Sequence, residues 1–142
     1  MKVIIMRGIP GSGKSTIASQ LGHEMYCSAD DYFINNDGVY NFNPIEIGEA
    51  HKSCMRKFLA GMNVRAKITV DNTNVELWEI SPYIAICQAY DVDYEIITVR
   101  CDPEIASKRN VHGVPEKTIL RMAERLERIK LLPWWNNRTI NN

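Results

Sequence analysis

The segment 3–16, VIIMRGIPGSGKST, constrains the fold of this chain more than any other stretch. Its first half is a run of β-branched and other apolar residues, which is typical of a buried strand. Three glycines and a proline then fall within six positions, and a lysine, a serine and a threonine follow at once. A turn that only reverses the chain needs one such residue, so this bend is predicted to enclose a ligand.

The same letters satisfy the phosphate-binding pattern G-x-x-x-x-G-K-[ST], the P-loop, between a predicted strand and a predicted helix. Glycines turn backbone N–H groups inward, the helix start adds positive charge, and Lys14 reaches the outer phosphates. Ser15 is the predicted ligand of Mg²⁺. We therefore predict an ATP·Mg²⁺ site. Its predicted contacts are Gly8, Pro10, Gly11, Ser12, Gly13, Lys14, Ser15 and Thr16.

Short apolar runs alternate with helical patterns along the chain, which predicts strands joined by crossover helices and a parallel sheet. Strands are predicted at 2–7, 25–28, 66–70 and 94–99, and helices at 14–22, 45–60, 75–90, 103–110 and 115–132. Gly61 is predicted to stop the second helix, and Pro82 to kink or break the third near Ser81. The expected fold is a three-layer α/β P-loop NTPase fold with a parallel sheet of four or five strands and a short helical lid. Residues 1–142 are expected to form one domain.

Composition excludes several classes of protein. The 17 basic and 17 acidic residues cancel, so no strong field indicates a nucleic-acid coat or a membrane-surface protein. The four cysteines lack the spacing of a zinc site, and we expect them to be reduced thiols. No run of about 20 apolar residues is present, so we expect neither a membrane span nor a signal peptide, and a cytoplasmic location.

Two polar segments follow predicted strands and so meet at the ligand-binding edge of the sheet. One of Asp30 and Asp31 can accept a hydroxyl proton, or the pair can simply serve a turn or helix cap. Asp71 occupies the place of an acid near the metal. Thr73 and Asn74 can bind phosphate or acceptor, although Asn74 can equally cap the next helix.

Movable cations are expected at the segment 108–113, KRNVHG, where a helix with paired basic residues meets a glycine-containing break. An arginine over a transferring phosphate would stabilise the transition state, which makes Arg109 a candidate catalytic and nucleotide-binding residue. The alternative is an ordinary helix end whose basic residues oppose the helix dipole.

These segments together resemble the P-loop polynucleotide 5′-kinase group, which includes phage end-healing enzymes and the small kinase-like domain of a eukaryotic ubiquitin-ligase-binding protein. The resemblance covers nearly the whole chain, through GIPGSGKST, SADDYF, DGVYNFNP, VDNTNVELWEISPY and RNVHGVPEKTILRMAERLE. The eukaryotic kinase-like domains look most similar.

The resemblance implies a function and roles for single residues. Lys14 and Ser15 would bind the phosphates of ATP·Mg²⁺, and Asp30 would take the proton from a 5′-OH of DNA or RNA. Asp71 would help to fix the acceptor end, and Arg109 would be the lid arginine. Two departures concern the acceptor: Phe33 stands where the phage kinase has an arginine, and the lid offers His112 and Gly113 in place of a second arginine.

Aromatic residues supply a candidate platform for the bases of a nucleic acid. They are Tyr32, Phe33, Tyr40, Phe42, Trp78 and Tyr83, with Lys52, Arg56 and Lys57 as candidate backbone contacts. Trp134 and Trp135 are predicted to clamp the last helix, with adenine stacking or a partner chain as alternatives. A homo-oligomer is compatible with the sequence.

Two other functions stay open at this point. A small-metabolite kinase would need a closed polar pocket in place of an open groove. A non-catalytic nucleotide-binding interaction module would keep the P-loop without turnover.

Overall fold

Five parallel strands make up the sheet of the computed structural model, which describes residues 2–142. The strands are β1 (Lys2–Arg7), β2 (Met25–Cys27), β3 (Ile68–Asp71), β4 (Asp93–Arg100) and β5 (Asn137–Asn141), in the order β2-β3-β1-β4-β5. Because all strands run the same way, their carboxyl ends share one edge, and the P-loop begins at the end of the central strand β1.

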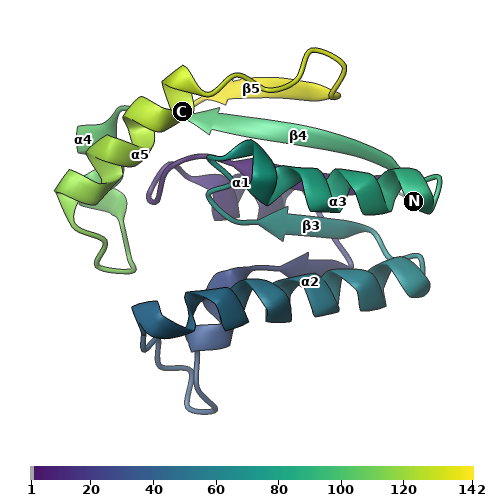
Figure 1. The fold of residues 1–142 in the computed structure, drawn as a ribbon. Helices are drawn as coiled ribbons and strands as arrows, with labels where there is room; N and C mark the ends of the chain where they lie inside the picture. Colours follow the sequence, from purple (N-terminus) through teal and green to yellow (C-terminus); the bar gives the residue numbers. More distant parts are fainter. Residues whose placement is uncertain (1) are drawn as a thin grey trace.

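The helices are α1 (Lys14–Leu21), α2 (Ile47–Asn63), α3 (Leu77–Ala89), α4 (Pro103–Arg109) and α5 (Glu116–Arg128). Two short 3₁₀ helices, η1 (Ala29–Phe33) and η2 (Pro44–Glu46), interrupt the long connection between β2 and α2. In Figure 1 the arrows of β3 and β4 point toward the side on which α4 and α5 lie. α4 and α5, which we call the lid helices, therefore lie over the carboxyl edge of the sheet.

The core forms on both faces of the sheet because alternate side chains of each strand point to opposite faces. Val3 and Ile5 pack in one apolar cluster with residues of α2 and α3, whereas Ile4 and Met6 pack in another with Ala18 of α1. A third cluster joins the P-loop to α4 and α5. Helices thus cover both faces, and the predicted three-layer α/β fold is confirmed.

The predicted end of the second helix at Gly61 is wrong. α2 continues through Gly61 to Asn63, because this glycine faces the sheet: a Cβ there would lie 2.7 Å from Ile68 Cδ1 and 2.8 Å from Met25 Sδ. Gly61 therefore permits close packing of a helix on a strand. α3 also continues through Pro82, which lies within the helix without ending it.

The fifth strand was not among the four segments predicted from the sequence. β5 is a polar segment, but it pairs in register with residues 96–100 of β4, and Arg138 donates to Glu95 Oε1 at 2.6 Å. Trp135, just before β5, is 6% exposed and belongs to the main core cluster, while Trp134 is 73% exposed. Trp135 therefore packs in the core with residues of the sheet, α2 and α3, and Trp134 stays on the surface. Within residues 2–142 no helix is long and apolar enough to cross a membrane.

Candidate nucleotide-binding and phosphoryl-transfer site

Backbone hydrogen bonds hold the P-loop between β1 and α1. The Gly8 amide donates to the Thr73 carbonyl at 2.9 Å, and the Ser12 amide donates to the Ile9 carbonyl at 3.2 Å. Gly13 is the N-cap of α1 at φ 97°, and among the described residues no side chain caps this helix. The first amide groups of α1 are therefore free to bind an anion.

Lys14 lies under this loop, 9% exposed, with its Nζ donating to the Ile9 carbonyl at 3.0 Å. Burial lowers the pKa of Lys14, and the charges of Asp71 and then Asp30 oppose that effect. Because an ammonium carries three N–H donors and Lys14 uses one of them on the Ile9 carbonyl, donors remain for a phosphate.

Asp71, at the end of β3, sits beside the predicted metal ligand. Its Oδ2 accepts a hydrogen bond from Ser15 Oγ at 2.7 Å and another from the Tyr26 hydroxyl at 2.5 Å. A P-loop hydroxyl paired with a carboxylate is the donor set that holds Mg²⁺ in P-loop proteins. Tyr26 was not among the predicted site residues. It is the middle residue of the three-residue strand β2, and no sequence motif there indicated this role.

Asp30 is carried by η1, just beyond β2, and two other residues fix that helix. Ser28 is the N-cap, and its Oγ accepts from the Asp30 amide at 3.2 Å. Asn72 Oδ1 accepts from the Ala29 amide at 2.9 Å, which ties η1 to the end of β3. Ser28, and not Asp30 or Asp31, therefore caps η1, and both carboxylates are left for other contacts.

The two adjacent carboxylates face different partners. Asp30 Oδ2 lies 3.5 Å from His112 Nε2, and Asp30 Oδ1 accepts from the Tyr40 hydroxyl at 3.5 Å. Asp31 Oδ2 instead lies 3.9 Å from Lys57 Nζ on α2. Burial raises the pKa of Asp31, and Lys57 opposes that effect.

Asn74 belongs to the frame of the site. It is 1% exposed, and its Nδ2 donates to the Met6 carbonyl at 2.8 Å. α3 has Glu76 as its N-cap, so Asn74 is not the cap that the sequence allowed. Buried Arg7 donates to the carbonyls of Asn74 at 3.0 Å, Val75 at 3.0 Å and Ile129 at 3.2 Å, and so joins this loop to the end of α5.

The lid packs directly on the P-loop. A Cβ on Gly11 would lie 2.0 Å from the Ala106 carbonyl oxygen of α4 and 3.1 Å from the Asn110 amide nitrogen. α4 ends at Arg109, whose side chain is exposed, and a break follows before α5. The predicted interruption at 112–113 is thus present, and it brings the start of the lid beside the cradle.

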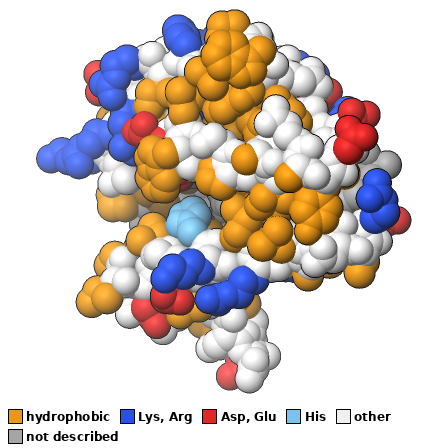
Figure 2. Space-filling view, turned by 45° about the vertical axis from the view of Figure 1, so that its right-hand side comes forward, with side chains coloured by type: hydrophobic (Ala, Val, Ile, Leu, Met, Phe, Trp, Pro, Cys, Tyr) orange, Lys and Arg blue, Asp and Glu red, His pale blue; other side chains and the backbone are white. Residues whose placement is uncertain are grey.

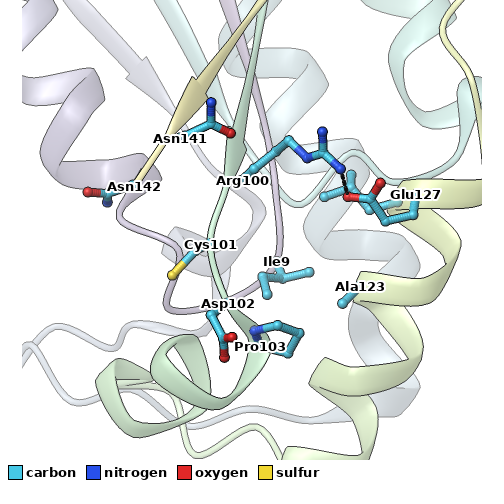
Figure 3. Close-up of a pocket in the computed structure, with 10 residues that line it drawn as sticks. Ile9, Arg100, Cys101, Asp102, Pro103, Ala123, Glu127, Asn141 and Asn142 are labelled. Carbon is cyan, nitrogen blue, oxygen red and sulfur yellow. Dashed lines mark hydrogen bonds and ion pairs between the residues drawn. The ribbon is translucent and has the colours of Figure 1, made fainter.

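A cavity of about 490 Å³ opens on the side of the P-loop away from Asp30. Ile9, the ends of β4 and β5, and Ala123 and Leu126 of α5 line it. Figure 3 shows Arg100 reaching toward Glu127, with which it forms an ion pair, while Ile9, Pro103 and Ala123 lie nearby. Since β1 lies between β3 and β4, this cavity and Asp30 flank the P-loop on opposite sides.

Comparison with known proteins agrees with this geometry. The model of the family described as "AAA domain" matches residues 3–129. The chain belongs to this family. It is 34% identical to human NEDD4-binding protein 2 in an alignment that covers 92% of this chain and 8% of that protein. The resemblance stated from the sequence is confirmed, and the domain is a P-loop kinase-like nucleotide-binding domain.

Solved structures share the fold. One is the structure of a Pnkp1/Rnl/Hen1 complex, with a TM-score of 0.62, 24% identity, and coverage of 80% of this chain and 40% of that one. Another is a sugar kinase from Janibacter sp. HTCC2649, with a TM-score of 0.65, 16% identity, and coverage of 99% and 84%. The chain spans less than half of the first relative in each comparison, so the activities of those whole proteins are not transferred to it.

Proposed function

We propose that this domain transfers the γ-phosphoryl group of ATP to the 5′-OH end of DNA or RNA. ATP·Mg²⁺ would supply the phosphoryl group and neutralise its developing charge. Lys14, Thr16 and the free amide groups of α1 would hold the phosphates, with Ser15 and Asp71 at the metal. The cavity between β4, β5 and α5 has room for the nucleoside. Residues 1–142 would act as a single kinase domain.

The placement of Asp30 carries this proposal. Burial lowers the pKa of Lys14, and the charge of Asp30 opposes that effect, although less than the charge of Asp71 does. Asp30 lies beyond β2, on the side of the P-loop away from the cavity, where an acceptor would enter. A carboxylate on the acceptor side of the P-loop lysine is what a general base for a hydroxyl requires. Asp31 and Thr73 remain proposed acceptor contacts, and Arg109 the proposed lid cation. Asn74 also remains a proposed acceptor contact, although its side-chain nitrogen already donates to the Met6 carbonyl.

The surface next to Asp30 favours a nucleic-acid acceptor over a small sugar. Exposed apolar side chains follow one another there: Tyr32, Ile34, Val39, Phe42, Ile45 and Ile47. Bases would stack on the two aromatic members, Tyr32 and Phe42, and Lys52, Arg56 and Lys57 of α2 would supply cations for a phosphate backbone. In Figure 2 hydrophobic groups gather in patches on one face, with lysine and arginine side chains nearby. Phe33 and Tyr83 are too buried to belong to the predicted platform, because they are 6% and 4% exposed.

A small-metabolite kinase is the second candidate, because the sugar kinase from Janibacter shares this fold along nearly the whole chain. Such an enzyme binds its acceptor in an enclosed polar pocket, whereas Tyr32, Ile34 and Phe42 beside Asp30 are exposed.

The test is phosphoryl transfer from γ-labelled ATP to 5′-OH oligonucleotides of DNA and RNA, beside a panel of sugars and nucleosides. We expect label at the oligonucleotide 5′ end, and label on sugars alone would contradict the proposal. Asp30→Asn should lower kcat by about 10³-fold or more while the Kd for ATP stays within about threefold. Asp37→Asn, at an exposed aspartate of the neighbouring turn, is the matched control.

A further inference from the structure

Two ordered loops from distant parts of the chain meet over Asp30. The first is a hairpin over residues 33–41, closed by a bridge between Ile34 and Tyr40. The side chain of Asn35 holds its turn, since Oδ1 accepts from the amides of Asp37 and Val39, each at 3.0 Å. Tyr40 therefore projects from a shaped turn.

The second loop is the lid loop, residues 110–115. Asn110 organises it, because its Oδ1 accepts from the His112 amide at 3.1 Å and its Nδ2 donates to the Val114 carbonyl at 2.7 Å. Gly113 adopts φ 68°, which lets the chain turn back toward α5. The backbone of His112 is therefore held in place, three residues beyond Arg109.

His112 and Tyr40 contact each other as well as the carboxylate. Their ring centroids lie 4.4 Å apart, and the rings are tilted by 43°. His112 Nε2 lies 3.5 Å from Asp30 Oδ2, and the Tyr40 hydroxyl donates to Asp30 Oδ1 at 3.5 Å. Each carboxylate oxygen thus meets a side chain from a different loop. Burial and then Asp30 raise the pKa of Tyr40 to about 12, so this hydroxyl stays a donor.

We propose that His112 is a positioning residue that joins the lid to the carboxylate of Asp30. This inference rests on the proposed function. Because the imidazole contacts both the acid and the tyrosine that orients it, lid closure and orientation of the acid become one event. The lid loop continues directly from Arg109, so the same event brings the lid arginine into place. His112 acts through Asp30 and touches no reacting atom.

The contact itself is tested by amide hydrogen exchange of the lid loop, which needs neither acceptor nor turnover. We expect His112→Ala to speed exchange over residues 110–114 by about threefold to tenfold, the scale of one partly exposed imidazole–carboxylate contact plus one ring contact. Val111→Ala, at a side chain that is 86% exposed in the same loop, should leave exchange unchanged. Tyr40→Phe keeps the ring and should preserve protection, whereas Tyr40→Ala should lose it.

The consequence for Asp30 is tested by kinetics. His112→Ala should lower kcat by about tenfold and change the KM for ATP by less than about threefold, because the P-loop and not the lid loop holds the phosphates. His112→Gln, which keeps a donor, should restore part of kcat. A purely structural role would instead lower the melting temperature of His112→Ala and affect both constants.

The outcomes separate the inference from the proposed function. Unchanged lid exchange in His112→Ala overturns the inference, and so does faster exchange with an unchanged kcat toward whichever acceptor is phosphorylated. Faster exchange together with lower kcat supports it. Failure to label any oligonucleotide, with sugars labelled instead, overturns the polynucleotide proposal while the exchange result still decides the contact.

Discussion

At the scale of single residues, the site depends on Asp71 having two hydroxyl donors on one oxygen. Ser15 and Tyr26 both donate to Oδ2, so the carboxylate is held before any metal binds. Burial and Asp71 raise the pKa of Tyr26, which keeps its proton available to the carboxylate. Tyr26 is thus a supporting residue on β2, the strand that also leads to Asp30.

Tyr26→Phe tests this support. Removing the hydroxyl leaves the carboxylate with one described donor, and we expect the free energy of unfolding to fall by about 1–2 kcal/mol, the scale of a hydrogen bond to a charged group. Urea denaturation measures this change. Tyr90→Phe removes an exposed hydroxyl that donates to Asn63 Oδ1 at 2.8 Å, and should cost less than about 0.5 kcal/mol. Equal losses in the two variants would contradict the special role of Tyr26.

At the scale of elements, the P-loop and the lid share one close contact. Gly11 needs a left-handed φ of 79°, and the space of its missing side chain is taken by the carbonyl of Ala106 on α4. Gly11 therefore serves the packing of α4 on the P-loop as well as the proposed phosphate binding, so a change at this position affects both elements.

Gly11→Ala should be much more harmful than Gly38→Ala. Both glycines have a φ near 80°, but a Cβ on Gly38 would meet nothing within 4 Å. We expect about 1–2 kcal/mol of destabilisation for Gly38→Ala from its φ, and at least about 3 kcal/mol for Gly11→Ala, which adds overpacking against backbone. Thermal and urea denaturation measure both. A similar cost for both variants would show that α4 yields freely.

At the scale of the whole molecule, buried thiols link stability to pH. Burial raises the pKa of Cys27 to about 12 and of Cys87 to about 11, from an ordinary value of 9.0. The unfolded chain then loses these protons first as the pH rises. The contribution of these two thiols to the free energy of unfolding is complete below the pKa of a thiol in the unfolded chain. It is lost as the pH rises through the pKa values of the folded protein.

We therefore expect the free energy of unfolding to fall above pH 9, by at most about 1.4 kcal/mol per pH unit for each such thiol. Urea denaturation at pH 8, 9 and 10 under reducing conditions measures the slope. Cys87→Ala should flatten it, with Cys101→Ala, at a partly exposed cysteine, as the control. A stability that is constant from pH 8 to 10 would contradict this expectation.

Much of this architecture could be predicted because the decisive signals are local. The glycine spacing with Lys14 and Ser15 requires a strand, a tight anion-binding loop and a helix in that order. Periodicity predicted the first four strands and the positions of the helices to within a few residues, and Asn-rich or Gly-rich segments indicated the loops. Because the carboxyl ends of parallel strands share one edge of a sheet, Asp30 and Asp71 could also be predicted to lie at the same edge.

The sequence alone thus determined the fold class and the phosphate cradle, because backbone chemistry within a few neighbouring positions dictates both. Tertiary structure alone decided β5, whose polar residues become a strand only by pairing with β4, and the continuation of α2 through Gly61, which faces Ile68. It also decided which groups meet Asp30 and Asp71. Tyr26, Tyr40 and His112 reach these acids from separate segments, and such contacts depend on how loops pack and not on any local pattern.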